Sequence, residues 1–528
     1  MSTRTAPSLL SGIAVSGQTV RLWGALVVAA LATVAAAHVS TIGFVAMAAI
    51  LLAVFAYVSY RAPRPMLVLM ILAPLIDRYV VRETVPANLQ RYGNALSEGL
   101  LVIVAIAIVV HGYRSGRLWP AIRHPLTALM LAFGAVAIVS TVVNHVSLEV
   151  AGLGTLFTVD AFVLFFLVRI IGFDEHDAWL AAVAFVAVAV VAALLALGQV
   201  VLSPDFLGLT TWTGRFGEGL RPGSIFIGQP NMLGAVVAIA LPFATFGVAR
   251  QELGLGWRAV CLAAALILGV ALIFTFSRGT WLAMAIAVGL VGILVERRAL
   301  AVAAIIGAAA LALAIALPRG ILLPANSQWS IDLGNATLGR IDAISQGRDQ
   351  RFKFMENALP ILQDHSILGS GPGTYGGGVA ADFGSPNYSR YTDGVVPSGR
   401  TVDNYWLHAV VEFGIVGAVL LFGMLGWAVL EMLRAIQGAT GRRRVLLAAV
   451  ATSTTLLALA SVTEMLLEGN TTSFALWFFI GVGSLLATPV AVETLVAGDN
   501  ADVATEPSGG PAAGLAAEAA AESVRAGG

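Results

Sequence analysis

The sequence predicts an all-α, polytopic membrane protein, and three features lead to this prediction. Of the 528 residues, 58% are hydrophobic, and the mean hydropathy is +0.88. Only 11% are charged, whereas a soluble domain needs about a quarter to cover its surface. The apolar residues also occur in many runs of about 20 residues, the length of an α-helix that crosses a bilayer. Because only helices and closed barrels can cross lipid, we expect these long continuous runs to be helices.

Fourteen windows are long and apolar enough, or nearly so, to cross a membrane, and the short window 65–78 is the weakest of them. We therefore expect about 12–14 transmembrane helices. The windows are 22–39, 41–60, 65–78, 95–112, 125–144, 153–171, 177–202, 231–249, 258–276, 279–296, 299–317, 404–433, 444–466 and 470–492.

These windows divide the chain into five parts. We expect a cytoplasmic N-terminal tail (1–21), transmembrane helices 1–11 (22–317), a large extracytoplasmic loop (318–402), transmembrane helices 12–14 (403–492) and a cytoplasmic tail (493–528). The last part is rich in Ala, Gly, Glu and Pro, so we expect it to be disordered.

The basic residues of the short connections predict the orientation. Cytoplasmic loops carry an excess of arginine and lysine, and these residues all fall on one side when fourteen spans are counted. Both termini are then cytoplasmic, in a bacterial inner membrane. The residues are Arg61, Arg64, Arg114, Arg117, Arg123, Arg250, Arg258, Arg297, Arg298, Arg434 and Arg442–Arg444. Ala35–Ala37 resembles a signal-peptide cleavage site, but an uncleaved first helix is favoured, and cleavage leaves the other spans unchanged.

Composition also excludes several classes of partner. The 30 basic and 30 acidic residues balance to a net charge of +0, which argues against nucleic acid as a partner. Cys261 is the single cysteine, so there is neither a disulfide framework nor a cysteine-based metal site. We expect no cofactor and no bound metal.

Three stretches are expected on the outer face: 203–230, the tight turn 276–279 and the long segment 318–402. The last is far longer than an ordinary connection, which indicates a functional loop. Within it the glycine-rich run 369–376 is expected to bring its backbone amides close to a ligand.

A short helix is predicted within the long segment. Apolar residues recur at helical spacing and could rest on the membrane surface, while Arg351 and Glu356 face elsewhere. The apolar residues are Phe352, Met355, Leu359 and Leu362.

Arginines on the outer face are unusual, because the charge bias of membrane proteins predicts few of them there. They are Arg215, Arg221, Arg278, Arg340, Arg348, Arg351 and Arg400. Long loops translocate regardless of charge, and this reason is sufficient for Arg319, Arg340 and Arg390. That reason is weak for Arg278, which lies in a very short turn, so we favour anion binding for Arg278 and Arg221. For Arg348 and Arg351 both interpretations stay open.

Several arginines at the outer membrane face suit a lipid pyrophosphate, because guanidinium groups bind phosphate in a bidentate manner without a metal ion. Polyprenyl-pyrophosphate-linked sugars present this group at that depth. Transfer of the glycan to an acceptor hydroxyl requires positive charge on the leaving pyrophosphate and a base for the hydroxyl proton. The candidate bases are Asp403, His365, His408, Glu356 and Asp364.

Two of these candidates also have structural explanations. Asp403 opens the twelfth span, where aspartate is a favoured helix N-cap, and the roles of cap and base are compatible. A lone helical histidine such as His408 is more often structural, and Glu412, four residues later, could pair with it.

Five motifs in order along 210–430 resemble those of the O-antigen ligase and Wzy-type polymerase superfamily. Each motif alone is weak, but their order and placement on the outer face are fairly specific. The motifs are Arg221-Pro222-x6-Gln229-Pro230-Asn231, Ser277-Arg278-Gly279-x-Trp281, Gly369-x-Gly371-Pro372-Gly373, Asp403-Asn404-x-x-Leu407 and Glu412-x-Gly414.

The resemblance implies a GT-C-like membrane fold and an inverting, metal-independent glycosyltransferase that uses undecaprenyl-pyrophosphate-linked glycan. Arg221 and Arg278 would bind pyrophosphate, with Arg348 or Arg351 contributing from the loop. Asn231, Asn404 and Tyr405 would complete the substrate site. The implied partners are the lipid-linked donor, a glycan or lipid acceptor, the bilayer and a protein that regulates chain length.

The chain departs from the ligase pattern at one position. Ligases of this superfamily commonly carry His-Asn where this sequence has Asp403-Asn404, which favours a polysaccharide polymerase over a ligase. With Asp403 as base, the reaction would use a carboxylate of ordinarily low pKa.

A transporter or flippase for a lipid-linked or anionic solute is the alternative. Transporters place charged or broken-helix sites near the bilayer midplane. Here Asp160 is the main mid-span charge, and the polar motifs cluster at one face, which favours chemistry at the membrane surface. A receptor or scaffold would not require arginines to converge.

Overall fold

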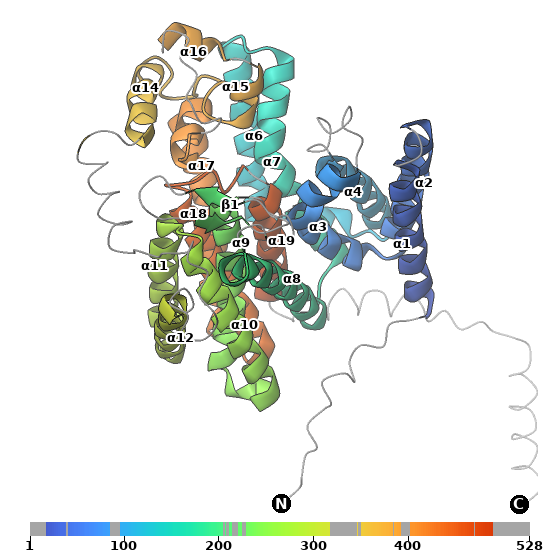
Figure 1. Ribbon diagram of the computed structural model, residues 1–528. Helices are drawn as coiled ribbons and strands as arrows, with labels where there is room; N and C mark the ends of the chain where they lie inside the picture. The colour runs from blue at the N-terminus through green and yellow to red at the C-terminus, as the bar shows by residue number, and fades with distance from the viewer. Residues whose placement is uncertain are drawn as a thin grey trace, which may run out of the picture. The chain divides into compact units, whose positions relative to one another are not determined.

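The computed structural model describes residues 17–37, 41–84, 96–203, 206, 211–213, 220–223, 229–316, 346, 350–383, 385–391, 402–468 and 470–488. Each predicted window corresponds to one long helix (Figure 1). These helices are α1 (Gly17–Ala37), α2 (Thr41–Arg61), α3 (Pro63–Thr84), α4 (Leu96–Arg114), α6 (Pro125–Val143), α7 (Leu148–Ile171), α8 (Glu175–Val201), α9 (Pro230–Ala249), α10 (Gly254–Phe274), α11 (Arg278–Val295), α12 (Arg297–Ala316), α17 (Tyr405–Ile436), α18 (Gly441–Ala460) and α19 (Asn470–Ala487).

The prediction of an all-α, polytopic membrane protein is confirmed. Within the described ranges, 10 helices are long and apolar enough to cross a membrane. Many side chains of the outer helices are apolar and exposed, for example Ile305 in α12 and Leu282 in α11. In a bilayer such side chains face lipid, so their exposure costs nothing there.

Helices α9, α18 and α19 form the centre of the compact unit Met1–Ala487. Helix α9 packs on α8, α10 and α18, and α19 packs on α7 and α17. Polar side chains between these helices are satisfied across the contact: the Ser453 hydroxyl of α18 donates to the Ile239 carbonyl of α9 at 3.0 Å. Gly234 permits a close approach, because a Cβ there would lie 3.1 Å from Ser277 Cβ.

The basic short connections gather at one end of the helices. Arg64 pairs with Asp177 at 2.8 Å, and Arg117 donates to the Ile171 carbonyl at 3.0 Å. Arg278, at the first position of α11, lies at the opposite end. The bias of basic residues predicts that the Arg64 end is cytoplasmic, and this orientation stays a prediction.

The segment between α12 and α17 contains α14 (Gln350–Asp364), α15 (Gly378–Phe383) and α16 (Pro386–Tyr391). Figure 1 shows these helices near the start of α17 and the ends of α6 and α7. The remainder of the predicted loop, including most of 317–349, lies outside the described residues.

Helix α14 confirms the helix predicted in this segment. Phe354 and Ile361 are buried in a small apolar core with Tyr375, whereas Met355 and Leu359 are exposed. The helix therefore has two apolar faces: one packs into this small core, and the other is exposed. Contact of the exposed face with the membrane surface stays a prediction.

Two short strands precede α9. Strand β1 (Thr211–Thr213) pairs antiparallel with β2 (Leu220–Pro222), and Trp212 lies opposite Arg221. This pairing places Arg221 in a strand, and its Nη2 donates to Asn231 Oδ1 at the start of α9.

Candidate functional site

The turn between α10 and α11 places Arg278 at the first position of α11, at the end of the helices opposite Arg64. Phe276 has φ of 51°, a left-handed conformation that non-glycine residues rarely adopt, and the Arg278 N–H donates to its carbonyl at 3.0 Å. The Trp281 Nε1–H donates back to the Leu272 carbonyl at 2.8 Å and so ties the two helices together. Strained backbone of this kind clusters at functional sites.

Arg221 is held against the same turn. Its Nε donates to the Thr275 carbonyl at 2.7 Å, and its Nη2 donates to that carbonyl and to Asn231 Oδ1, each at 2.5 Å. The predicted residues Arg221, Asn231 and Arg278 are therefore brought to one place, although 57 positions separate Arg221 from Arg278 in the sequence.

Glu464 completes this group from the connection between α18 and α19. Its Oε1 accepts from Asn231 Nδ2 at 2.6 Å. The backbone of the same connection binds the start of α17, because the Tyr405 N–H donates to the Ser461 carbonyl at 2.9 Å. We call Arg221, Asn231, Thr275, Arg278 and Glu464 the arginine cluster.

Sequence reasoning missed Thr275 and Glu464. Both lie at the edge of apolar windows, 258–276 and 444–466, where a polar residue looks like the end of a span. An acidic residue inside a window, such as Glu464, was the available signal, because a carboxylate at that depth requires a partner.

The start of α17 corrects one expectation. The N-cap is Asn404, whose Oδ1 accepts from the Leu407 N–H at 3.0 Å, and not Asp403. Asp403 precedes the cap and is half-buried. Tyr405, predicted in the substrate site, has a side chain only 1% exposed, so only its backbone faces the arginine cluster.

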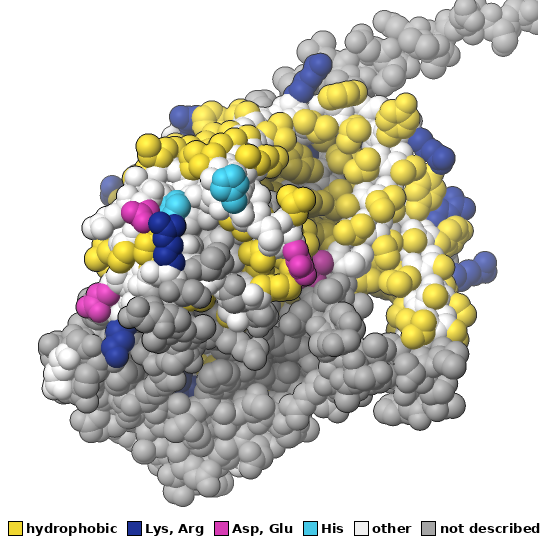
Figure 2. Space-filling view, turned by 90° about the horizontal axis from the view of Figure 1, so that it is seen from above, with side chains coloured by type: hydrophobic (Ala, Val, Ile, Leu, Met, Phe, Trp, Pro, Cys, Tyr) yellow, Lys and Arg dark blue, Asp and Glu magenta, His cyan; other side chains and the backbone are white. Residues whose placement is uncertain are grey.

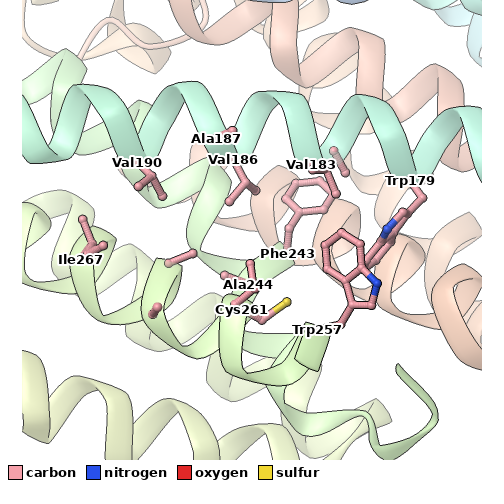
Figure 3. A pocket seen from close by; sticks show the side chains of 14 residues that line it. Trp179, Val183, Val186, Ala187, Val190, Phe243, Ala244, Trp257, Cys261 and Ile267 are labelled. Atoms are coloured by element: carbon pink, nitrogen blue, oxygen red, sulfur yellow. The ribbon is translucent and has the colours of Figure 1, made fainter. Parts of the chain in front are cut away.

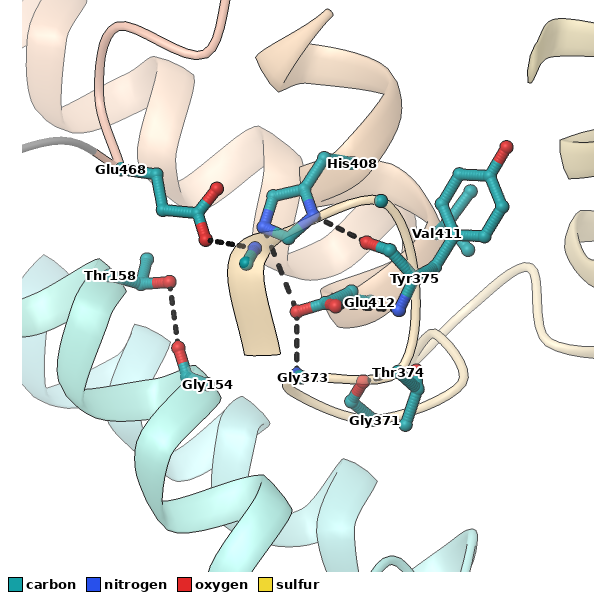
Figure 4. Close-up of polar contacts among 12 residues, drawn as sticks. Gly154, Thr158, Gly371, Gly373, Thr374, Tyr375, His408, Val411, Glu412 and Glu468 are labelled. Carbon is teal, nitrogen blue, oxygen red and sulfur yellow. Dashed lines mark hydrogen bonds and ion pairs between the residues drawn. The ribbon is translucent and has the colours of Figure 1, made fainter. Parts of the chain in front are cut away.

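The pairing predicted between His408 and Glu412 is confirmed. His408 Nε2 lies 3.7 Å from Glu412 Oε2, and His408 Nδ1 lies 2.6 Å from the Tyr375 carbonyl (Figure 4). The His408 side chain is 3% exposed. Both ring nitrogens therefore face protein groups in a buried site.

The glycine-rich loop is bound by protein rather than left open to a ligand. Glu412 accepts from the N–H groups of Gly373 at 2.8 Å and Tyr375 at 2.7 Å (Figure 4). Gly371 N–H donates to the Glu412 carbonyl at 3.0 Å. The expectation that the loop's amides approach a ligand is wrong for these three groups, because a buried carboxylate and a carbonyl occupy them.

Glu468 extends this network toward the connection between α18 and α19. Its Oε1 accepts from the Gly378 N–H at 3.3 Å, and a Cβ at Gly377 would lie 2.7 Å from that oxygen and 3.0 Å from His408 Cε1. Glycine at 377 thus allows Glu468 and His408 to approach each other (Figure 4). The connection between α18 and α19 therefore contributes Glu464 to the arginine cluster and Glu468 to the network around His408.

Two side chains outside the membrane spans have shifted pKa values. Burial raises the pKa of Tyr388 to about 12, so its hydroxyl stays protonated and accepts from the Gly376 N–H at 2.8 Å. Burial also lowers the pKa of His365, at the end of α14, and the nearby Asp364 opposes this effect only in part. His365 is therefore neutral near pH 7.

Four other predicted residues, Arg348, Arg351, Glu356 and Asp364, lie in the segment before α17. Arg348 lies outside the described residues, and Arg351 is in α14 with a side chain that is likewise outside them. Glu356 and Asp364 are exposed on α14, and Asp364 accepts from the Tyr391 hydroxyl at 2.5 Å. In the described part of the chain, no three His, Cys, Asp or Glu side chains are grouped as metal ligands.

Figure 2 shows the molecule from the end at which α14, α15 and α16 lie. Hydrophobic side chains cover much of the described surface, and charged side chains are scattered among them. The view also shows a hollow lined by hydrophobic side chains, with acidic side chains at its edge. Such a surface is consistent with a substrate that has both an apolar and a polar part.

Comparison with known proteins supports the resemblance seen in the motifs. A family model described as O-antigen ligase matches residues 263–422, and a search of curated proteins gives no match. The matched segment contains Arg278, the glycine-rich loop and Glu412. This match supports a relationship of the chain, through residues 263–422, to the superfamily of O-antigen ligases and Wzy-type polymerases, which are membrane proteins that handle glycans.

Proposed function

We propose that the protein transfers a polyprenyl-pyrophosphate-linked glycan to an acceptor hydroxyl at the outer face of the inner membrane. The observation that carries this proposal is the arginine cluster, in which Arg221 is fixed on the turn that presents Arg278. Two arginines preorganised at one membrane face supply the positive charge that a leaving pyrophosphate requires.

The arrangement of donors suits this role. Arg221 uses Nε and Nη2 on Thr275 and Asn231, so its orientation is set before substrate binds. Arg278 begins α11, where the helix dipole adds partial positive charge. Bond cleavage at the sugar C1 leaves the polyprenyl pyrophosphate with an added negative charge, which these groups stabilise.

We assign the base to Asp403. It lies one residue before the N-cap Asn404, beside the backbone that contacts Ser461. His408 is the weaker candidate, because its ring is buried and both nitrogens face protein groups. The Asp403 carboxylate would take the acceptor proton while the acceptor oxygen attacks C1, with inversion at that carbon.

The decisive experiment is turnover by the purified full-length protein on polyprenyl-pyrophosphate-linked repeat units, with EDTA present. We expect glycan transfer that Arg278→Ala lowers by about 100-fold or more, since one such electrostatic donor contributes about 10²–10³. Arg390→Ala is the matched control, because Arg390 is an exposed arginine of α16. Equal turnover by both variants and the wild type would refute the role of the cluster.

The products also separate the remaining alternatives. Extension of the lipid-linked glycan identifies a polymerase, which the Asp403-Asn404 pair favours, and transfer to a second lipid identifies a ligase. Movement of intact substrate across proteoliposomes without new glycosidic bonds would identify a flippase.

A further inference from the structure

A cavity of about 400 Å³ lies between α8, α9 and α10, away from the arginine cluster. Its lining is apolar, with aliphatic and aromatic side chains from all three helices (Figure 3). One lining residue, Val260, is 53% exposed, so the cavity opens on the lipid-facing side of the helices. Water finds no hydrogen-bond partners in such a lining, whereas burial there stabilises a hydrocarbon chain.

Two tryptophans mark one end of the cavity. Figure 3 shows Trp179 and Trp257 at this end and Val190 and Ile267 at the other. The indole rings contact edge to face, with centroids 5.8 Å apart. Trp179 lies two residues after Asp177, which pairs with Arg64 at the basic end of the helices. Tryptophan is enriched where a bilayer meets water. The cavity therefore begins at interface depth and runs into the apolar layer.

Two polar groups at this end have no hydrogen-bond acceptor among the described residues. Trp179 Nε1 is buried, and none of the described residues accepts a hydrogen bond from it. The Arg442 guanidinium stacks on the same indole, 5.5 Å from the ring centroid. Within the described residues Arg442 forms neither a hydrogen bond nor an ion pair, whereas its neighbour Arg444 donates to the Val295 carbonyl at 2.9 Å. In the described part of the chain, a cation and an N–H donor here thus have no acceptor.

We propose that this cavity binds one acyl chain of an anionic phospholipid from the leaflet at the basic end. The phosphate lies beside Arg442, the ester region lies at the level of Trp179, and the chain fills the space toward Ile267. Charge decides this occupant over the polyprenyl donor, whose pyrophosphate belongs at the arginine cluster on the opposite end. A basic residue near the membrane surface adds about 1 kcal/mol to binding of an anionic lipid.

Native mass spectrometry of the full-length protein tests the proposal. The purified, delipidated protein is incubated with equal amounts of phosphatidylglycerol, phosphatidylethanolamine and undecaprenyl phosphate. We expect one phosphatidylglycerol per chain to be retained. Arg442→Gln should lower its affinity about fivefold, the equivalent of about 1 kcal/mol, and the exposed Arg298→Gln should leave it unchanged.

A second pair of variants tests the cavity itself. Ala187→Phe places a ring from an exposed lining position into the cavity and should abolish retention, whereas Ala304→Phe, at an exposed position of α12, should not. Both must elute and melt as the wild type does, and Arg442→Gln serves if Ala187→Phe does not fold. Retention of undecaprenyl phosphate or phosphatidylethanolamine instead, no retained lipid, or retention insensitive to Arg442→Gln and Ala187→Phe would each overturn the proposal.

Discussion

Glu412 in α17 accepts the Gly373 N–H at 2.8 Å, and this contact joins two motifs that are 39 positions apart. The second Glu412 oxygen accepts the Tyr375 N–H at 2.7 Å. Helix α17 breaks two residues later at Gly414, where φ is 69°. The Gly-x-Gly-Pro-Gly run and the Glu-x-Gly run are therefore one structural unit, in which a buried carboxylate fixes a loop beside a broken helix.

Removing this carboxylate should destabilise the protein. Glu412→Ala leaves two buried N–H donors without acceptors, at about 1–3 kcal/mol each, and we expect a clear drop in melting temperature. Glu412→Gln keeps an acceptor oxygen and should lose less. Thermal unfolding in detergent measures both effects, and Glu356→Ala, on the exposed face of α14, is the control. If Glu412→Ala melted at the same temperature as Glu356→Ala, this account would be wrong.

The helix break makes a separate prediction about glycine. A Cβ at Gly414 would lie 2.5 Å from the Gly369 nitrogen, and φ of 69° is unfavourable for any side chain. We expect Gly414→Ala to lower stability by about 1–2 kcal/mol from the backbone alone, and more from the clash. Gly423→Ala is the matched control in the same helix, because nothing lies within 4 Å of its Cβ. A helical alanine there should be neutral or stabilising, by up to about 1 kcal/mol.

The spans were predictable because each is a long apolar run with its own local signal. All fourteen windows correspond to helices, and the helix at 350–364 followed from apolar spacing alone. The motifs also predicted that Arg221, Asn231 and Arg278 belong to one site. The structure holds Arg221 against Asn231 and against the turn before Arg278, and a joint role of the three residues stays a prediction.

The pairings within the site were not predictable in the same way. Asn231 meets Glu464 through helices that are distant in sequence, and no local pattern records such a contact. The glycine-rich loop was misjudged for the same reason: its composition indicates freedom to approach a ligand, but the Glu412 carboxylate that occupies its amides lies in another element. Asn404 rather than Asp403 caps α17, because both residue types suit a cap and only the backbone decides between neighbours.

The contact between Asn231 and Glu464 predicts a positioning role. Glu464→Ala removes the acceptor that orients Asn231, so the Arg221 guanidinium should lose its fixed geometry and kcat should fall by about 10–100-fold. Glu464→Gln retains an acceptor oxygen and should rescue most of the activity. A purely structural role for Glu464 predicts instead that activity follows the melting temperature across the two variants, and parallel measurement of kcat, KM and unfolding distinguishes these cases.

The identity of the base gives the last prediction. Asp403→Asn keeps the size of the side chain but cannot take a proton, so turnover should fall by about 10²–10⁴-fold with little change in KM or melting temperature. His408→Gln should lower stability and activity together, because His408 is buried between Tyr375 and Glu412. His365→Gln should leave turnover unchanged, although burial lowers its pKa and keeps it neutral, as a base must be. Full activity of Asp403→Asn combined with loss of activity in His365→Gln would move the base from the residue before the α17 N-cap to the end of α14.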